Sequence, residues 1–335
     1  MTSVIDVQMM FSVELTPQLL CHQLDFMSTT HLSDDPLVID NAVRRYERCW
    51  LPLAAEVARS ELSLCPPVDV HWIWHCHMLA PRHYERDCLQ LVGKVVGHRV
   101  RLAEQLAERR LATADVWRQK YPQEPFDVTD ASPSAAAGPY QRLSSYDLSA
   151  AVRRQSKFFY NVSLPHYRDD VFLQQAVARY RKFLLLKLRH RDALLVPTYD
   201  IDLVWHTHQL HPLVYKHDTA RLMGRMLNHD DNLNDRDPDS PLLSAYVRTK
   251  QLWRQAYREH YALTGAMYRG ERPHGRLADD TGLAGNDRKK TVLRLATDAF
   301  QSCVMPEDVE QLWGPVPLPK LPEGTDNKCF AASHR

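Results

Sequence analysis

The chain has 335 residues, of which 44% are hydrophobic and 25% are charged, and its formal net charge is +1. This composition can bury a hydrophobic core, whereas the near-zero charge argues against a surface that binds nucleic acid or an anionic membrane. The seven cysteines form no C-x-x-C pair, no run of about eighteen apolar residues could span a bilayer, and the first residues lack a secretion signal. We therefore expect reduced thiols and a cytoplasmic or nuclear protein with no membrane partner.

Four sequence blocks follow one another in the first half of the chain, and the same four return in the second half. VELTPQLLCHQLDFM (13–27) aligns with YDLSAAVRRQSKFFY (146–160), and NAVRRYERCW (41–50) aligns with QAVARYRKFL (175–184). DVHWIWHCHMLAP (69–81) aligns with DIDLVWHTHQLHP (200–212), and VWRQKY (116–121) aligns with LWRQAY (252–257). Because order, spacing and identity agree, with an offset of about 131 to 136 residues, we interpret the chain as an internal duplication.

Helical periodicity dominates both copies. In residues 145–162 the stripe of Leu148, Val152, Gln155 and Phe159 recurs at helical spacing, and residues 172–188 carry a similar stripe. Thr198 and Pro197 predict the start of a helix that Pro212 ends, and a further helix begins at Pro212 itself. Few segments alternate with a period of two.

These patterns predict a mainly α fold with two tandem pseudo-repeat helical domains and an irregular, proline-containing C-terminal tail. We place the first repeat at residues 1–121, a linker rich in Pro, Ser and Ala at 122–143, the second repeat at 144–270, and the irregular segment at 271–335. Within that last segment, only the apolar stretch 291–305 suits a short helix or strand.

The W-H-x-H segments concentrate the chemistry of the chain. Successive helical residues differ by about 100°, so His206 and His208 cannot bind one metal ion together from a continuous helix. The second histidine of each copy, His77 or His208, shares a face with the preceding Trp74 or Trp205, and we expect this face to be buried. The first histidine faces the residue four positions earlier, which is His71 for His75 and Asp202 for His206.

Two interpretations of these side chains stay open. The favoured one is structural: neutral core histidines donate to a carbonyl or carboxylate and need no cofactor. The other is a zinc or iron site, because two histidines and a carboxylate suit Fe(II) and a three-ligand site that keeps a water suits zinc. The metal candidates are Asp200, Asp202, His206, His208 and His229, and His98 is the counterpart of His229. The wider set of ligand or partner candidates comprises Asp69, His71, Trp74, His75, His77, Tyr84, Asp200, Asp202, Trp205, His206, His208, His211 and Tyr215.

Other sequence motifs are weak or absent. We find no P-loop, dinucleotide-binding glycine motif, nucleophile elbow or H-E-x-x-H zinc motif. Residues 229–239 begin like a calcium-binding loop, but Asp235 occupies the position that needs glycine and no glutamate closes the loop. A solvated loop of Asx turns is the better interpretation.

VPTYDIDLVWHTHQLHPLVY (196–215), WIWHCHMLAPRHYERDC (72–88) and TGAMYRG (264–270) resemble the glycine-rich domain-containing protein family, and the similarity covers roughly residues 11–270. The resemblance implies a duplicated N-terminal region without an established activity or accepted catalytic residues. It also implies links to growth, stress and abscisic-acid responses in plants. Plant members often continue into an RNA-binding segment and a glycine-rich region, whereas this chain has only eleven glycines.

The leading functional hypothesis is therefore a non-enzymatic interaction or regulatory protein with a protein or peptide partner, in stress or growth signalling as the resemblance implies. The alternative is a metal-dependent enzyme built on the His/Asp set. An RNA-associated protein comes third, because the charge of the chain gives no support for nucleic-acid binding.

Overall fold

The computed structural model describes residues 11–30, 32, 35–57, 64–100, 103–128, 140–230 and 240–270, and within these ranges the regular elements are all helices. The mainly α fold predicted from the sequence is confirmed. The chain divides into a compact unit up to Tyr261, which holds all the helices named here, and a second unit from Ala262 onward. The stretch 291–305 and most of the acidic loop lie outside the described residues.

Helices of the first repeat are α2 (Pro17–Thr29), α3 (Pro36–Arg45), a π-helical turn η1 (Tyr46–Trp50), α4 (Leu51–Val57), α5 (Val68–Met78), α6 (Pro81–Val92) and α7 (Ala103–Lys120). Those of the second are α8 (Leu148–Val162), a short 3₁₀ turn η2 (Pro165–Arg168), α9 (Asp170–Arg189), α10 (Tyr199–Gln209), α11 (Pro212–Met223) and α12 (Pro241–Tyr257). The W-H-x-H segments form α5 and α10. No helix among the described residues is both long enough and apolar enough to cross a membrane.

Equivalent residues set the helix ends in both repeats. Pro81 begins α6 and Pro212 begins α11, because proline at the first helical position has the required φ and needs no hydrogen-bond acceptor. Gly93 and Gly224 end the same two helices with φ values of 74° and 72°, which favour glycine. After each glycine the chain turns back toward the preceding helix.

Buried hydrogen bonds repeat as well. The Trp74 indole N–H donates to the Tyr84 hydroxyl at 2.9 Å, and this hydroxyl donates to the Val96 carbonyl. The indole of Trp205 donates to the Tyr215 hydroxyl at the same distance, and Tyr215 donates to the Leu227 carbonyl. Trp74 and Trp205 are 4% and 3% exposed, so the predicted equivalence and burial of the two tryptophans are confirmed.

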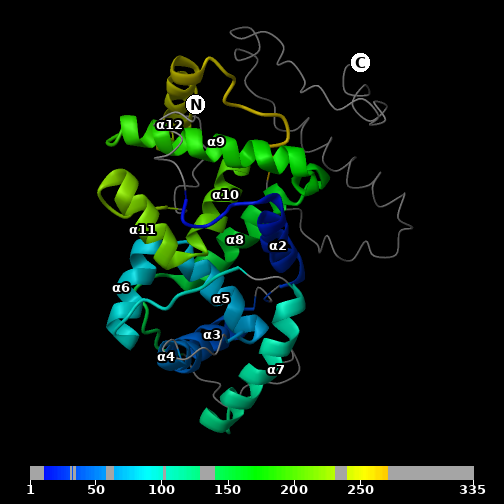
Figure 1. Cartoon of the computed structure of the whole chain (residues 1–335). Coiled ribbons are helices and arrows are strands. Elements are labelled where there is room, and N and C mark those ends of the chain that lie inside the picture. Colours follow the sequence, from blue (N-terminus) through cyan, green and yellow to red (C-terminus); the bar gives the residue numbers. More distant parts are fainter. Residues whose placement is uncertain are drawn as a thin grey trace, which may run out of the picture. The chain divides into compact units, whose positions relative to one another are not determined.

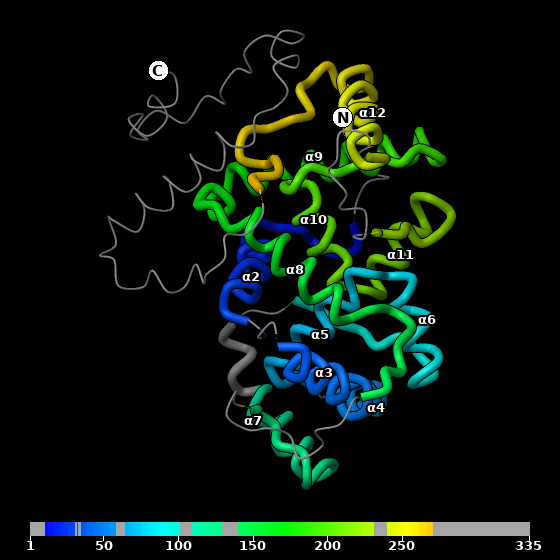
Figure 2. Tube along the Cα trace, turned by 180° about the vertical axis from the view of Figure 1, so that it is seen from behind, coloured from blue at the N-terminus to red at the C-terminus, as the bar shows by residue number. Residues whose placement is uncertain are grey.

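The first helix of each repeat packs mainly on the other repeat. Helix α8 packs on α5 and α3 of the first repeat, whereas its counterpart α2 packs on α9 and α10 of the second. Figure 1 and Figure 2 show α2 and α8 lying side by side between the two sets of helices. The two repeats consequently share one hydrophobic core, and their limits as two separate domains stay a prediction.

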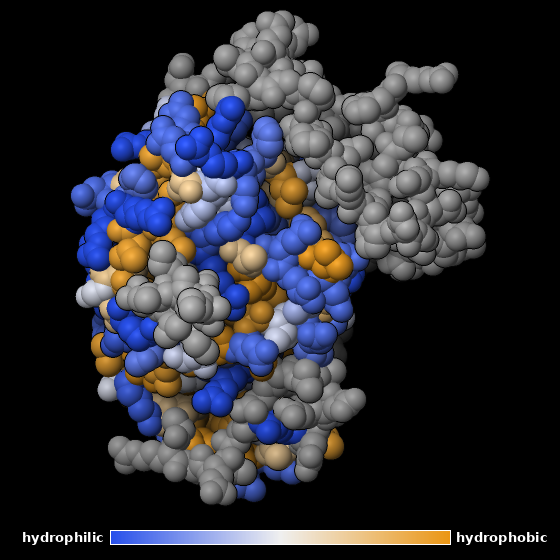
Figure 3. Space-filling view, turned by 45° about the horizontal axis from the view of Figure 1, so that its top comes forward, coloured by the Kyte–Doolittle hydropathy of each residue, from blue (hydrophilic) through white to orange (hydrophobic). Residues whose placement is uncertain are grey.

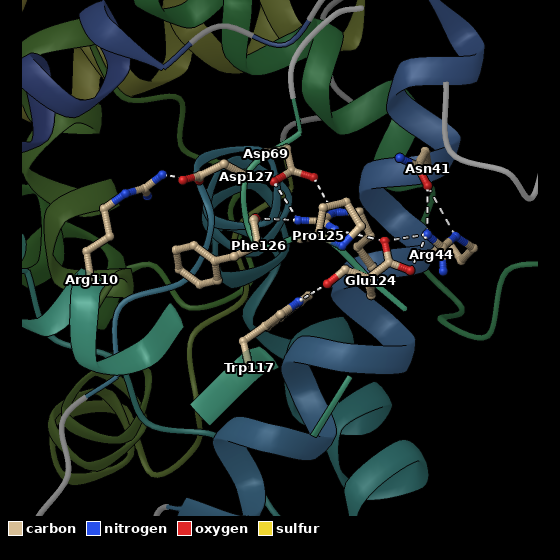
Figure 4. A network of polar contacts seen from close by, with 10 residues as sticks. Asn41, Arg44, Asp69, Arg110, Trp117, Glu124, Pro125, Phe126 and Asp127 are labelled. Carbon is tan, nitrogen blue, oxygen red and sulfur yellow. Dashed lines mark hydrogen bonds and ion pairs between the residues drawn. The ribbon is translucent and has the colours of Figure 1, made fainter. Parts of the chain in front are cut away.

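The first residues of the predicted linker are anchored to the first repeat. The Arg45 side chain, which is fully buried, donates to Glu124 and to the carbonyls of Pro125 and Phe126. Figure 4 shows this polar network, in which the Trp117 indole also donates to the Glu124 carbonyl. The path of residues 122–126 is thus set by the first repeat.

Candidate functional site

The second histidine of each W-H-x-H segment, His77 or His208, is buried, and the two occupy matching positions in their repeats. The Tyr46 hydroxyl lies 2.9 Å from His77 Nδ1, and the Tyr180 hydroxyl lies 3.0 Å from His208 Nδ1. On the other side of each ring, Nε2 lies 3.3 Å from a carboxylate, that of Asp87 or Asp218. For His208 these contacts fit a neutral imidazole whose Nε2–H donates to the Asp218 carboxylate and whose Nδ1 accepts from the Tyr180 hydroxyl.

The two carboxylates also bind the segment that enters the other repeat's first helix. Ser145 donates its backbone N–H and its hydroxyl to Asp87 at 2.9 and 2.5 Å. Ser12 donates the same two groups to Asp218 at 2.7 and 2.5 Å. Burial alone would raise the pKa of Asp87, but the hydrogen bonds from His77 and Ser145 outweigh it and lower this pKa to about 2. The Tyr–His–Asp–Ser chains are therefore structural links between the repeats.

The aspartates at the start of α5 and α10 are paired with arginines. Arg45 Nε lies 2.7 Å from Asp69, and Arg179 Nε lies 2.6 Å from Asp200. Each arginine also stacks on a tryptophan at 5.2 Å, Trp117 or Trp253. Asp200 is thus an ion-pair residue, and the prediction that it joins a common metal set with Asp202 does not fit this geometry.

The first histidine of each segment, His75 or His206, lies on the opposite side of its helix from His77 or His208, as helical geometry requires. Both are 1% exposed. Burial lowers the pKa of His75 well below its ordinary value, and the neighbouring His206 and His98 lower it further, so the first- and second-repeat histidines lie close together. Phe158 covers His206 with ring centroids 4.2 Å apart, and Phe26 covers His75 at 5.4 Å.

In the second repeat, His206 gathers with Asp202 and His229 into one cluster. His229 Nε2 lies 3.1 Å from Asp202 Oδ1, and His206 Nε2 lies 3.7 Å from Asp202 Oδ2. One ligand atom from each residue can be chosen so that all three atoms lie within 4.8 Å of one another. Among the residues that the structure describes, no other group of three histidine, cysteine or carboxylate side chains meets this criterion. The side chains of His206, His229 and Asp202 are 1%, 7% and 18% exposed.

The matching set in the first repeat is His71, His75 and His98, which lacks a carboxylate. The rings of His71 and His98 are 5.7 Å apart, and His98 Nδ1–H donates to the Leu210 carbonyl of the second repeat at 2.6 Å. Burial lowers the pKa of His71 to about 3, so this imidazole is neutral. Because the first repeat has His71 at the position of Asp202, only the second repeat has a cluster that contains a carboxylate.

The remaining candidates have internal partners. Trp74, Trp205, Tyr84 and Tyr215 form the buried pairs described above. His211 donates from Nδ1 to the Thr207 carbonyl at 2.9 Å and accepts at Nε2 from the backbone N–H of Val100. Of the five predicted metal candidates, only Asp202, His206 and His229 converge, because His208 lies on the opposite side of α10.

Six residues that contact the W-H-x-H helices were not predicted from the sequence. Arg45 and Arg179, Tyr46 and Tyr180, and Asp87 and Asp218 hold the histidine helices, yet none was among the candidates. Each pair carries the same amino acid at equivalent positions of the two repeats, and that identity is the signal that could have found them.

Comparisons with known proteins agree with the duplicated architecture. A family model described as glycine-rich domain-containing protein-like matches residues 18–87 and again residues 83–218. Glycine-rich domain-containing protein 1 of Arabidopsis thaliana is 42% identical over 257 residues, which cover 72% of this chain and 31% of that protein. Glycine-rich domain-containing protein 2 of the same plant is 40% identical over 254 residues, with 72% and 32% covered. The chain thus spans about a third of the length of these relatives, and no solved structure matches it.

Proposed function

The chain belongs to the glycine-rich domain-containing protein-like family, and from this membership we propose that it is a non-enzymatic interaction or regulatory module for a protein or peptide partner. The growth or stress role implied by the resemblance is a further prediction that this proposal does not require. The relatives are about three times as long as the matched region, which suits a module that works beside other segments.

One observation supports the proposal most directly: the second histidine of each W-H-x-H segment, His77 or His208, is engaged in contacts inside the protein. His77 and His208 are 0% exposed and linked to tyrosine and aspartate, and the serines bound to those aspartates join the two repeats. A catalytic histidine or carboxylate must instead reach its substrate. The paired W-H-x-H segments therefore serve to hold one rigid unit together.

Two buried cysteines are unsuited to nucleophilic catalysis. Burial raises the pKa of Cys49 and of Cys88 to about 11, so both thiols are protonated at neutral pH. The thiolate, not the thiol, is the nucleophile in cysteine catalysis. These two cysteines are core residues.

A groove beside α7 is the surface that we assign to the partner. It has a volume of about 540 Å³ and is lined by Arg110, Leu111, Ala114, Arg118, Phe126 and Asp127. Leu111 is 70% exposed, and the Arg110 guanidinium lies 5.2 Å from the centre of the Phe126 ring. Figure 4 shows Arg110 extending past Phe126 toward Asp127. The apolar strip suits a peptide with an apolar anchor, and an acidic neighbour on that peptide would compete with Asp127 and Asp115 for Arg110 and Arg118.

The wider surface gives no stronger candidate on the face drawn in Figure 3, where hydrophobic and hydrophilic side chains of the described residues intermingle. Exposed apolar side chains such as Leu37, Leu213 and Val247 are scattered over different helices. Single exposed apolar residues are ordinary on protein surfaces. The groove beside α7 combines an exposed apolar residue with a concave shape.

The test compares two surface variants of the full chain. Leu111→Glu places a charge in the groove, whereas Val247→Glu places one at the equivalent position of α12, where Lys250 replaces Ala114. Val247 is 46% exposed, so neither change should disturb the core. Proximity labelling in the native host should show partners that are lost with Leu111→Glu and retained with Val247→Glu, and the lost partner should then bind the purified chain directly.

Equal melting temperatures of both variants are required for this comparison. If the labelled partners are the same for Leu111→Glu and wild type, the groove is not the contact surface. If the purified chain turns over a substrate and Asp202→Ala abolishes this turnover, the protein is an enzyme and the proposal fails.

The second candidate function is a metal-dependent enzyme, and the convergence of Asp202, His206 and His229 favours it. Two histidines and one carboxylate can hold a catalytic metal when coordination positions remain open to substrate. We place it second because both histidines are almost fully buried and the carboxylate occurs in only one repeat.

A further inference from the structure

Beyond partner binding, we propose that Asp202, His206 and His229 bind one divalent transition-metal ion, zinc foremost, as a structural centre of the second repeat. The ion would join the first turn of α10 to its last turn and to the segment that follows α11. It is a stabilising element, and the proposed partner surface beside α7 does not depend on it.

The distances between the ligand atoms suit a small ion. Ligands about 2.0–2.2 Å from a tetrahedral zinc ion lie roughly 3.3–3.6 Å from one another. Asp202 Oδ1 is 3.1 Å from His229 Nε2 and Asp202 Oδ2 is 3.7 Å from His206 Nε2, so each imidazole nitrogen already lies near one oxygen of the carboxylate. With one ligand atom taken from each residue, the three atoms lie within 4.8 Å of one another and need only draw together around the ion.

The donor set selects the class of metal. Neutral imidazole is a preferred ligand of zinc, iron, copper and nickel, whereas calcium and magnesium require mostly oxygen ligands. Two imidazoles and one carboxylate therefore exclude calcium and magnesium as the preferred ions. The carboxylate also compensates part of the positive charge of a buried divalent cation.

The surroundings hold two of the three ligands in place before any ion binds. His229 lies edge-on to the Trp205 ring with centroids 4.8 Å apart, and the Phe158 ring lies 4.2 Å from that of His206. Trp205 is fixed in turn by its hydrogen bond to Tyr215. Rigid packing behind the ligands lowers the entropic cost of ordering them around a metal.

The first repeat supplies a built-in control. His98 lies edge-on to Trp74 with centroids 4.8 Å apart, as His229 does to Trp205, but its neighbour is His71 where the second repeat has Asp202. His98 Nδ1 also donates to the Leu210 carbonyl. Removing the His98 ring should therefore disturb packing to a similar extent as removing the His229 ring, without removing a metal ligand.

The experiment uses the full chain without a histidine tag, stripped with EDTA and then titrated with cobalt(II) and zinc(II). The wild type should take up one cobalt ion per chain with visible absorption bands of low-symmetry coordination, and zinc should displace it and raise the melting temperature. His229→Ala and Asp202→Ala should weaken zinc binding by more than the roughly 10–100-fold that loss of an outer-shell partner costs. His98→Ala should bind zinc like the wild type.

Two outcomes would overturn the proposal. One is a wild type that takes up no stoichiometric cobalt and whose melting temperature is unchanged by zinc and by EDTA. The other is equal loss of zinc affinity in His98→Ala and His229→Ala, which would show a packing effect. Because Asp202→Ala leaves a buried histidine pair, Asp202→Asn provides a second variant of nearly the same shape, and it should also lose affinity. None of these results bears on partner binding at α7.

Discussion

Trp205 contacts several buried residues of the second repeat. Its indole donates to Tyr215, its ring lies 5.6 Å from Phe183 and 4.8 Å from His229, and only 3% of its surface is exposed. Trp205→Ala should lower the free energy of unfolding by about 3–5 kcal/mol, because it leaves a large cavity and removes the hydrogen bond that the Tyr215 hydroxyl accepts. Chemical denaturation measures this loss. Leu213→Ala, at a 52% exposed position, is the control. A Trp205→Ala loss below about 1 kcal/mol would show that the indole is not a core element.

His211 carries a second residue-scale prediction, concerning pH. Burial lowers its pKa from 6.5 to about 4, despite the hydrogen bond to the Thr207 carbonyl, so the folded protein holds this ring neutral. The unfolded chain binds a proton more readily, and the stability contributed by the neutral ring is therefore lost as pH falls from about 6.5 to 4. A shift of this size corresponds to about 3 kcal/mol at full protonation.

The measurement compares unfolding free energies of wild type and His211→Ala at several pH values. The equivalent residue of the first repeat is Ala80, so alanine is tolerated at this place in the fold. The variant should lose stability less steeply than wild type between pH 6.5 and 4, although other buried histidines contribute to both curves. Parallel curves in this range would contradict the assignment.

At the scale of elements, the segments that lead into α2 and α8 connect the two repeats through one repeated motif. Ser12 binds Asp218 and Ser145 binds Asp87 through the same two groups. Because hydrogen bonds to a charged group are stronger than neutral ones, we expect Ser12→Ala and Ser145→Ala each to cost about 1–2 kcal/mol of unfolding free energy. The cost should be smaller when each serine is replaced in the background of Asp218→Asn or Asp87→Asn, because a neutral amide oxygen accepts a weaker hydrogen bond than a carboxylate.

Double-mutant cycles by chemical denaturation test this coupling. Ser28→Ala is a suitable control, because the Ser28 hydroxyl donates only to the Asp25 carbonyl within α2. Serine replacements that cost as much with asparagine as with aspartate in place would show that the serines do not act through the carboxylates.

Contacts between residues close together in the sequence could be predicted, whereas contacts between distant segments could not. Helix α10 and the pairing of Asp202 with His206 follow from helical spacing alone, since residues four apart share a face. The sequence also makes His229 a metal candidate and the counterpart of His98, and the left-handed Gly224 lets the chain turn back so that His229 reaches Asp202. The burial of His77 and His208 follows from their place beside a tryptophan on the apolar face.

The exchange of α2 and α8 could not be predicted in the same way. The sequence of an amphipathic helix predicts which of its faces is buried, but it does not predict which of two similar repeats covers that face. The partners of His208 lie on three other segments, at Tyr180, Asp218 and, through Asp218, Ser12. Only the three-dimensional arrangement decides among such distant combinations.

At the scale of the whole molecule, the unit up to Tyr261 has no simple division between its repeats. Gln209 donates to the Leu79 carbonyl and His98 donates to the Leu210 carbonyl, so the turns that follow α5 and α10 are also joined. With α2 and α8 each covering the other repeat, removal of either repeat would expose a large apolar surface of its partner. Exposed apolar surface of this extent destabilises an isolated half.

This shared core predicts a single cooperative unfolding transition for the unit. Hydrogen exchange followed by mass spectrometry should give α5 and α10 the same opening free energy, because neither helix can unfold while the other stays packed. Trp74→Ala, which leaves a cavity in the first repeat, should lower the protection of α10 as much as that of α5. Two independent domains would behave differently, since a cavity in one would leave the protection of the other unchanged. Full retention of α10 protection in Trp74→Ala, together with a loss in α5, would therefore show that the repeats fold separately despite their exchanged helices.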